Sequence, residues 1–359
     1  MLSQLRCHSF RNLADIDWRP GAGCHLILGP NGAGKSSLLE AVYLLATTRS
    51  FRTSRLADCV RAGEPSFDIH GEVDVDGRIS LHVGWSAQGP SRSVNGNSTS
   101  LAQHLGVLPL VAWSAADGDL LTGTPGVRRR FLDRGIVGLR PGALETLSRY
   151  RRALDHKRRL LESEGEGLVS WNRVLAAAAS ELMLLRRDFT RRVAVALERL
   201  IAKRNLPLPE VEMRYRPSIA DADGWESVFA ALEALAARER RQGRPLAGPH
   251  RDELEFRFAG RRIRGMASGG ERKALGLALA AAREAVLREA GRPPVLLLDD
   301  ADAELDAARL EQIWPAFADC RQMLVSSSRP EVWSFLGEAT RWPLSRGRPG
   351  PPEGLPIDS

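Results

Sequence analysis

The chain has few cysteines and no long apolar segment, and both absences narrow its class. Cys7, Cys24, Cys59 and Cys320 are scattered, with neither a CxxC pair nor the spacing of a metal site. Such thiols are typical of a reducing compartment. No apolar run reaches the length of a membrane-spanning helix, charged residues interrupt any apolar segment near the start, and no internal repeat is evident. These absences predict a soluble, cytoplasmic protein.

The composition is that of a globular protein with a basic balance. The 359 residues are 43% hydrophobic and could hold two or three average domains, or one core with a large insertion. The net charge is +7 and the isoelectric point is near 9.7, carried mainly by arginine. This balance favours a polyanionic partner, either nucleic acid or an anionic membrane surface. An arginine-rich proteome is the alternative explanation.

The stretch GPNGAGKS, from Gly29 to Ser36, matches the phosphate-binding pattern G-x-x-x-x-G-K-[ST]. Its small residues let backbone N–H groups surround a phosphate. We expect Lys35 to neutralise the β- and γ-phosphates of ATP and Ser36 to reach a Mg²⁺ ion. An apolar strand precedes the stretch and an amphipathic helix follows it, which disfavours a chance glycine-rich turn. The residues expected to bind the nucleotide here are Gly29, Pro30, Asn31, Gly32, Ala33, Gly34, Lys35, Ser36 and Ser37.

Strand patterns dominate the region after the P-loop helix. Apolar and polar residues alternate over residues 69–85, and Asn95-Gly96 is typical of a hairpin turn, so an antiparallel sheet is predicted. Leu105 to Trp113 is predicted as a buried strand. This layout is not that of a small P-loop kinase.

A basic helical region follows, from Gly126 to about Arg241. Helices are predicted over Pro141–Leu161, Val169–Asn205 and Trp225–Arg241. Between positions 128 and 159 there are eleven lysines and arginines against three acidic residues. We interpret this run as a set of DNA phosphate contacts, the alternative being a solvated helix face.

The chain then supplies acidic residues suited to ATP hydrolysis. The apolar strand Val295–Leu298 ends in two carboxylates, the Walker B arrangement. Asp299 is expected to hold Mg²⁺, directly or through water, and Asp300 to deprotonate the attacking water. A helix N-cap is the alternative for such a pair. Ser268, Gly269 and Gly270 stand before a predicted helix, where N–H groups and the helix dipole favour a phosphate.

Residues 268–271 (SGGE) are called the SGGE segment below. The P-loop, the SGGE segment, the Walker B strand and Glu304-Leu305-Asp306 follow one another along the chain in the order found in the ABC-type ATPase head, which this chain resembles. In that family, the signature segment of one subunit closes on ATP held by the P-loop of another. The resemblance implies an ATP-dependent homodimer in which Ser268 and Gly270 meet the γ-phosphate in trans. Lys35, Asp300 and Ser268 are then the residues expected to act in catalysis.

Within that superfamily, the chain resembles the RecF family of SMC-like ATPases. The resemblance rests on Phe10-Arg11-Asn12, GPNGAGKSSLLEAVYLL, residues 128–133 (RRRFLD), residues 248–252 (GPHRD) and LLDD with ELD. It implies that Arg11 and Asn12 lie near the nucleotide. It also implies action at single-strand gaps in recombinational repair and replication restart, on duplex DNA and gap junctions, with RecO and RecR as partners.

Two expected residues of ABC heads are missing. The segment 109–113 has no Q-loop glutamine, and Ser326-Ser327-Ser328 replaces a switch histidine, so γ-phosphate sensing must be weaker or use a hydroxyl. Slow, DNA-stimulated turnover is expected. Two alternatives stay open, a nucleotide-gated DNA scaffold with negligible turnover and a transporter ATPase subunit.

The predicted fold is α/β, an ABC-type P-loop ATPase head with an antiparallel β subdomain and an inserted helical subdomain. The first half of the head is assigned to 1–125 and the basic insert to 126–243. The second half of the head is assigned to 244–341, and residues 342–359 are expected to be disordered.

Overall fold

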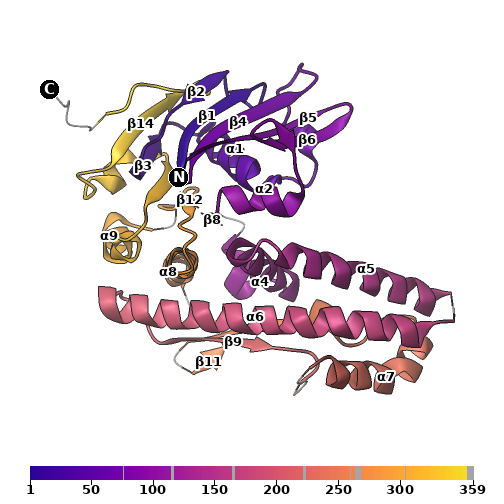
Figure 1. Ribbon diagram of the computed structural model, residues 1–359. Coiled ribbons are helices and arrows are strands. Elements are labelled where there is room, and N and C mark those ends of the chain that lie inside the picture. The colour runs from indigo at the N-terminus through magenta and orange to yellow at the C-terminus, as the bar shows by residue number, and fades with distance from the viewer. Residues whose placement is uncertain are drawn as a thin grey trace. The chain divides into compact units, whose positions relative to one another are not determined.

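The computed structural model describes residues 1–75, 77–114, 117–163, 166–220, 224–258, 260–262, 268–303 and 305–353. The chain forms two compact units. Unit 1 comprises residues 1–118, 199–208 and 267–359, and unit 2 comprises residues 119–198 and 209–266. Figure 1 shows the elements of both. Each unit is described by itself below.

Unit 1 contains an antiparallel sheet and a mainly parallel sheet among its described residues. The antiparallel sheet has the order β2-β1-β4-β5-β6-β7. Its strands are β1 (Leu2–His8), β2 (Ile16–Trp18), β4 (Phe67–Asp74), β5 (Arg78–Ser86), β6 (Gly89–Val94) and β7 (Asn97–Ser98). The second sheet has the order β15-β14-β3-β13-β12-β8. Its strands are β3 (Gly23–Leu28), β8 (Leu110–Trp113), β12 (Val295–Leu298), β13 (Gln322–Ser327), β14 (Thr340–Ser345) and β15 (Arg348–Pro349).

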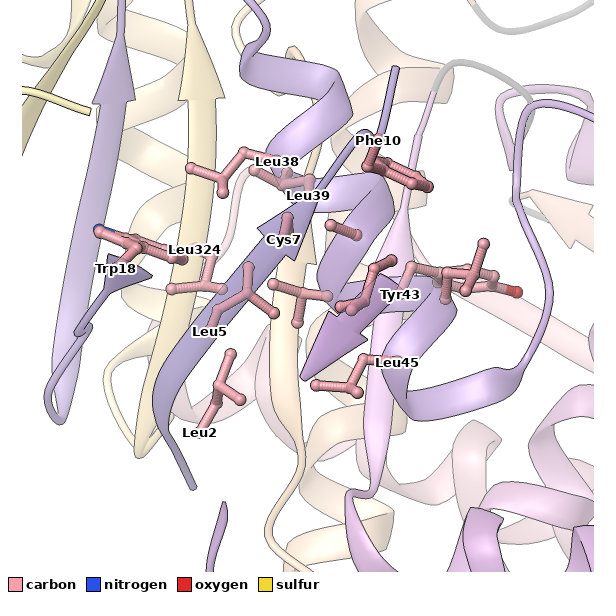
Figure 2. Close-up of a cluster of buried hydrophobic side chains, with 14 of the residues drawn as sticks. Leu2, Leu5, Cys7, Phe10, Trp18, Leu38, Leu39, Tyr43, Leu45 and Leu324 are labelled. Atoms are coloured by element: carbon pink, nitrogen blue, oxygen red, sulfur yellow. The ribbon is translucent and has the colours of Figure 1, made fainter. Parts of the chain in front are cut away.

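Helix α1 (Lys35–Thr47) is the centre of the unit 1 core. It contacts strands of both sheets, β4 and β5 on one side and β8 and β13 on the other. Figure 2 shows Leu38 and Leu39 of α1 in one apolar cluster with Leu5 of β1 and Leu324 of β13. Because all four side chains are fully buried, α1 is held from two directions.

The other helices of unit 1 are short, except the one that carries the SGGE segment. They are α2 (Leu101–Val107), α8 (Gly269–Glu289) and α9 (Ala307–Ile313). The predicted strand from Leu105 to Trp113 is wrong in its first half, where α2 is found. Ser100 and Gln103 form a reciprocal capping box that begins α2, and Pro109 separates it from β8.

Unit 2 is built from helices and a small antiparallel sheet. The helices are α3 (Asp119–Thr122), α4 (Pro125–Leu139), α5 (Ala143–Glu162), α6 (Leu168–Arg204, of which 199–204 belong to unit 1) and α7 (Trp225–Gln242). The sheet has the order β11-β10-β9, with β9 (Val211–Arg216), β10 (Glu253–Phe258) and β11 (Arg261–Arg262). The three helices predicted from periodicity correspond to α5, α6 and α7.

Two predicted boundaries differ from the structure. The segment 244–266, assigned to the ATPase head, lies in unit 2, because β10 pairs with β9 over its whole length. The segment from 342 was expected to be disordered, yet Trp342 lies in β14, which pairs in parallel with β3. The Trp342 indole N–H donates to His25 Nδ1 at 3.1 Å, and its ring meets Trp18 edge to face. Residues 354–359 of this segment lie outside the described part of the chain.

Helix α6 is long and apolar enough to span a membrane when judged by length and composition alone. Its most apolar stretch has a mean hydropathy of 1.2, and 44% of that stretch is buried inside the protein. The prediction that no run reaches this length is therefore too strong. Core helices of soluble proteins pass the same test, so the finding is weak support for a membrane span.

The residues 128–133 and 248–252 meet in a buried polar network of unit 2. Arg186 of α6 is 3% exposed and donates to Asp133 at 2.7 Å and to Asp252 at 3.1 Å. Asp252 also accepts the Tyr215 hydroxyl. Arg128 is buried and donates to Glu253. These motif residues therefore hold α4, α6 and β10 together.

A second buried ion pair joins α5 to α7. Lys157 Nζ lies 2.6 Å from Glu239 Oε2, and both side chains are fully buried. Desolvation lowers the pKa of Lys157, while Glu239 acts to raise it. Breaking such a pair leaves a buried charge without a partner.

We predict that Lys157→Met destabilises the protein by about 3–5 kcal/mol, because Glu239 is then buried and unpaired. The double variant Lys157→Met/Glu239→Gln should recover most of this loss, since the amide oxygen still accepts the Leu246 N–H that Glu239 accepts at 2.8 Å. Urea unfolding measures both variants. Equal destabilisation of the two would mean that lost packing, rather than an unpaired charge, sets the cost.

Candidate nucleotide-binding site

The P-loop lies between β3 and α1 in unit 1. Strand β3 is central in its sheet, paired in parallel with β13 and β14. Lys35 is the first residue of α1, and Gly34 is its N-cap. The Lys35 side chain is 5% exposed and donates to the carbonyls of Gly29 and Pro30 at 2.9 and 3.1 Å. The ammonium group is therefore held inside the loop that precedes it.

Asn12 links the N-terminal strands to the P-loop. Its side-chain amide donates to the Gly32 carbonyl at 2.8 Å, and its amide oxygen accepts the Ser37 hydroxyl at 2.7 Å. Asn12 therefore contacts both the loop and the first turn of α1.

Arg11 is anchored to a buried carboxylate of α1. Its guanidinium makes two hydrogen bonds to Glu40, at 2.7 and 3.0 Å, and Glu40 is fully buried. The Ser50 hydroxyl also donates to Glu40, at 2.5 Å. Arg52, which is about half exposed, lies 3.5 Å from the same carboxylate.

These groups border a cavity of about 500 Å³. Its lining brings together most of the residues that the sequence predicts for the site. The cavity is lined by Arg11, Asn12, Asn31, Gly32, Gly34, Lys35, Ser36, Ser37, Arg52, Val60, Ala62 and Asp300. Of the other predicted residues, Gly29, Pro30, Ala33 and Asp299 belong to adjoining segments of the chain but do not line it.

The two Walker B carboxylates follow β12 and are held by a serine of β13. The Ser326 hydroxyl donates to Asp299 Oδ1 at 2.6 Å and accepts the Asp300 backbone N–H at 2.9 Å. Asp300 has a φ of 48°, a left-handed conformation that is uncommon for a residue with a side chain. Its carbonyl accepts Lys273 Nζ of α8 at 3.1 Å. The Asp300 backbone is thus fixed on both sides.

The surroundings of the Asp300 carboxyl group raise its pKa. Although Asp300 is exposed at the cavity, partial desolvation raises its pKa above the usual 3.8, and the neighbouring Asp299 raises it further. A raised pKa is typical of a carboxylate that takes up a proton.

Two of the three serines that replace a switch histidine form hydrogen bonds within the protein. Ser326 bonds the Walker B pair, and the Ser327 hydroxyl donates to Asp302 Oδ2 at 2.9 Å. Asp302 is nearly fully buried and also accepts Arg329 Nε at 3.1 Å. Ser326 therefore fixes the Asp299 carboxylate and the Asp300 backbone, a contact that sequence reasoning missed.

The SGGE segment begins α8. The Ser268 hydroxyl accepts the Glu271 N–H at 3.2 Å, and Glu271 accepts the Ser268 N–H at 2.7 Å, a complete capping box. Ser268, Gly269 and Gly270 are not among the residues that line the cavity. Of the segment Glu304-Leu305-Asp306, Glu304 lies outside the described residues, and Asp306 caps α9.

Besides Ser326, sequence reasoning did not predict three further contributors to the site. Arg52, in the segment between α1 and β4, lines the cavity. Glu40 ties α1 to Arg11. Gly347, in the turn between β14 and β15, donates to the Ala33 carbonyl at 2.9 Å and accepts the Ala14 N–H at 3.1 Å. Of the three, only Arg52 stands in a stretch of the sequence that is rich in polar and arginine residues.

Comparisons with known proteins agree with this geometry. The family description "RecF/RecN/SMC N terminal domain" matches residues 1–341. The DNA replication and repair protein RecF of Geobacter sp. (strain M21) is 35% identical over 317 residues, which cover 86% of this chain and 87% of that protein. The chain belongs to the RecF family. RecF of Acidothermus cellulolyticus is 34% identical over 92% of this chain and 94% of its own.

Solved structures show the same fold. The recombination mediator protein RecF with ATP, of the RecFOR pathway, has a TM-score of 0.85 and 25% identity, covering 99% of this chain and 97% of that one. An SMC head bound to the C-terminal winged-helix domain of ScpA has a TM-score of 0.59 and 17% identity, with 99% and 98% covered. The predicted ABC-type ATPase head is thereby confirmed.

We predict that Gly347→Ala weakens ATP binding. Gly347 has a φ of 75°, and a Cβ there would lie 2.2 Å from the Asn12 carbonyl oxygen, so the turn must move away from the P-loop. Titration with a fluorescent ATP analogue should show the loss. Gly337→Ala, where a Cβ meets nothing within 4 Å, is the matched control. Unchanged affinity in Gly347→Ala would mean that the turn does not support the loop.

Proposed function

We propose that this protein is an ATP-dependent DNA-binding switch. Two copies close on ATP, act at single-strand gaps in recombinational repair and replication restart, and separate after slow hydrolysis. The observation that carries the proposal is the cavity in which Lys35, Ser36 and Asp300 face the same space. The RecF relatives, one of them solved with ATP and assigned to the RecFOR pathway, support it. RecO and RecR are the proposed protein partners.

The cavity residues have the chemistry that ATP and Mg²⁺ need. The Lys35 ammonium is positioned at the start of α1, where the helix dipole also favours an anion. Ser36 and Asp299 are the proposed Mg²⁺ ligands, because a hydroxyl and a carboxylate supply the oxygen donors that this ion prefers. One oxygen of Asp299 is occupied by Ser326, and the other remains for the ion. When bound, the ion neutralises charge on the phosphates.

Asp300 is the proposed general base. Its raised pKa gives the carboxylate a higher affinity for the proton of the attacking water than an ordinary aspartate has. The contacts from Ser326 and Lys273 hold its backbone, so the carboxylate does not need to be ordered during the reaction.

Ser268, Gly269 and Gly270 are proposed to act on the ATP of a second copy. Support comes from their place at the N-terminus of the 21-residue helix α8, in unit 1, while they are absent from the cavity lining of their own copy. A helix N-terminus presents N–H groups to a phosphate.

Four arginines of the basic region are the proposed DNA contacts. Most of the eleven basic residues in 128–159 have partners, for example Arg128 with Glu253 and Arg149 with Glu181. Within residues 128–159, all of which the structure describes, four exposed arginines have no side-chain partner. They are Arg130, Arg134, Arg152 and Arg159. Each pair, four apart on α4 and seven apart on α5, lies on one face of its helix.

Two substitutions separate hydrolysis from dimerisation. Asp300→Asn should abolish ATP hydrolysis and keep the ATP-dependent dimer, because the amide cannot take a proton. Ser268→Arg should keep ATP binding and lose the dimer, because a bulky cation stands at the proposed interface. Ser268→Thr, which retains a capping hydroxyl, is its control. Phosphate release and analytical ultracentrifugation measure the two properties.

The raised pKa of Asp300 adds a pH dependence to the wild-type rate. The base must be ionised, so hydrolysis should fall on acidification at a pH above that expected for a carboxyl of pKa 3.8.

An Asp300→Asn rate of ATP hydrolysis equal to that of the wild type would indicate a scaffold that binds ATP without using this base. A Ser268→Arg protein that still dimerises with ATP would exclude the trans arrangement.

DNA is tested through the four arginines. ATP hydrolysis should rise with duplex DNA that carries a single-stranded gap, and the rise should disappear at higher salt. Replacing all four by alanine should weaken DNA binding and reduce the slope of log affinity against log salt by about one per lost phosphate contact. Arg149→Ala/Arg158→Ala, at exposed but ion-paired positions, is the matched control. A rate of ATP hydrolysis that does not change when DNA is added would mean that DNA bound to the basic unit does not control the ATPase.

A further inference from the structure

The outward face of the antiparallel sheet carries two histidines and an aspartate that the proposed function does not use. Alternate residues of β4 and β5 point to opposite sides, and Ile69 and Val83 point into the core. His70 of β4 and His82 of β5 are directly opposite each other in the register, and Asp68 is opposite Gly84, two pairs further along. The three side chains therefore share the outer face.

The three side chains converge on one point. One ligand atom from each of Asp68, His70 and His82 lies within 4.8 Å of the other two. His82 Nε2 is 2.8 Å from Asp68 Oδ1, and the two imidazole rings stack with centroids 4.4 Å apart. A Cβ at position 84 would lie 2.7 Å from Asp68 Oδ1, so the carboxylate occupies space that only glycine leaves open.

We propose that Asp68, His70 and His82 bind one divalent transition-metal ion, and that Zn²⁺ is the ion they fit best. Two imidazoles and a carboxylate form a donor set that Zn²⁺ accepts, whereas Mg²⁺ and Ca²⁺ prefer oxygen ligands alone. Ligand atoms around a tetrahedral Zn²⁺ ion, about 2.0–2.1 Å from it, are roughly 3.3 Å apart. The three ligand atoms lie within 4.8 Å of one another, so binding requires them to move toward this spacing.

The two basic neighbours of the cluster on β1 each have an acidic partner of their own. Arg6 of β1 is opposite His70, and its guanidinium is turned to Asp17 at 3.3 Å. His8 is opposite Asp68 and lies 3.1 Å from Asp15. Desolvation and the nearby His82, His8 and Arg6 lower the pKa of His70, and the neutral imidazole is the form that binds a metal ion.

The bound ion joins β4 to β5 and has room for a further ligand. His70 is exposed and Asp68 is 46% exposed, so a water molecule or a side chain from another protein completes the coordination. An ion that binds only the folded sheet stabilises it by mass action.

Isothermal titration of the full-length, untagged protein with ZnCl₂ in excess MgCl₂ tests the site. The expected result is one saturable Zn²⁺ ion per chain and a rise in Tm that EDTA reverses. His70→Ala and His82→Ala should each lose this binding and keep ATP affinity. His156→Ala, which removes a histidine stacked on Trp171 of unit 2, should keep it. Absence of saturable binding, or equal loss in His156→Ala, would overturn the proposal.

A spectroscopic measurement on the unmodified protein covers the case in which a variant folds poorly. Cu²⁺ added at one equivalent should give an electron paramagnetic resonance spectrum with splitting from two imidazole nitrogens. Gly84→Ala should weaken Zn²⁺ binding without removing any ligand, because the new methyl group displaces the Asp68 carboxylate. A spectrum without nitrogen coupling would leave the cluster as an ordinary surface ion pair and sink the proposal.

Discussion

The burial of α1 between two sheets is the constraint on which the rest of unit 1 depends. Its apolar residues touch strands of both sheets, so the helix has no solvent face along most of its length. The P-loop is the segment that enters this helix, and its position follows from the packing of Leu38 and Leu39. A site placed by a packed core is held more precisely than one placed by a surface loop.

Polar contacts extend that order from the core to the cavity. Glu40 is a buried carboxylate in the same helix, and its charge is matched by Arg11, with Ser50 and Arg52 beside it. A buried charge is stable only when it is paired, so Glu40 holds in place the segments that line the cavity. Ser326 of β13 likewise holds the two Walker B residues in place. Its one hydroxyl donates to the Asp299 carboxylate and accepts the Asp300 backbone N–H.

Local patterns in the sequence predicted the elements better than their partners. The P-loop, the Walker B strand and α5 to α7 follow from spacing and periodicity, which are properties of short windows. The pairing of β10 with β9, and of β14 with β3, depends on contacts across dozens to hundreds of residues, which no window contains. The same reason explains why Arg128 looked like a DNA contact, since its partner Glu253 is 125 residues away. Serine at 326 carries no local sign that it positions carboxylates.

The pairing of β3 with β13 and β14 also has a consequence for synthesis on the ribosome. Residues 29–36 are made early, yet the strands that flank β3, and the Gly347 turn that contacts Ala33, are made about 300 residues later. Contacts between such distant parts of a chain form late and slowly. The nascent protein therefore cannot assemble a finished ATP cavity until almost the whole chain has emerged.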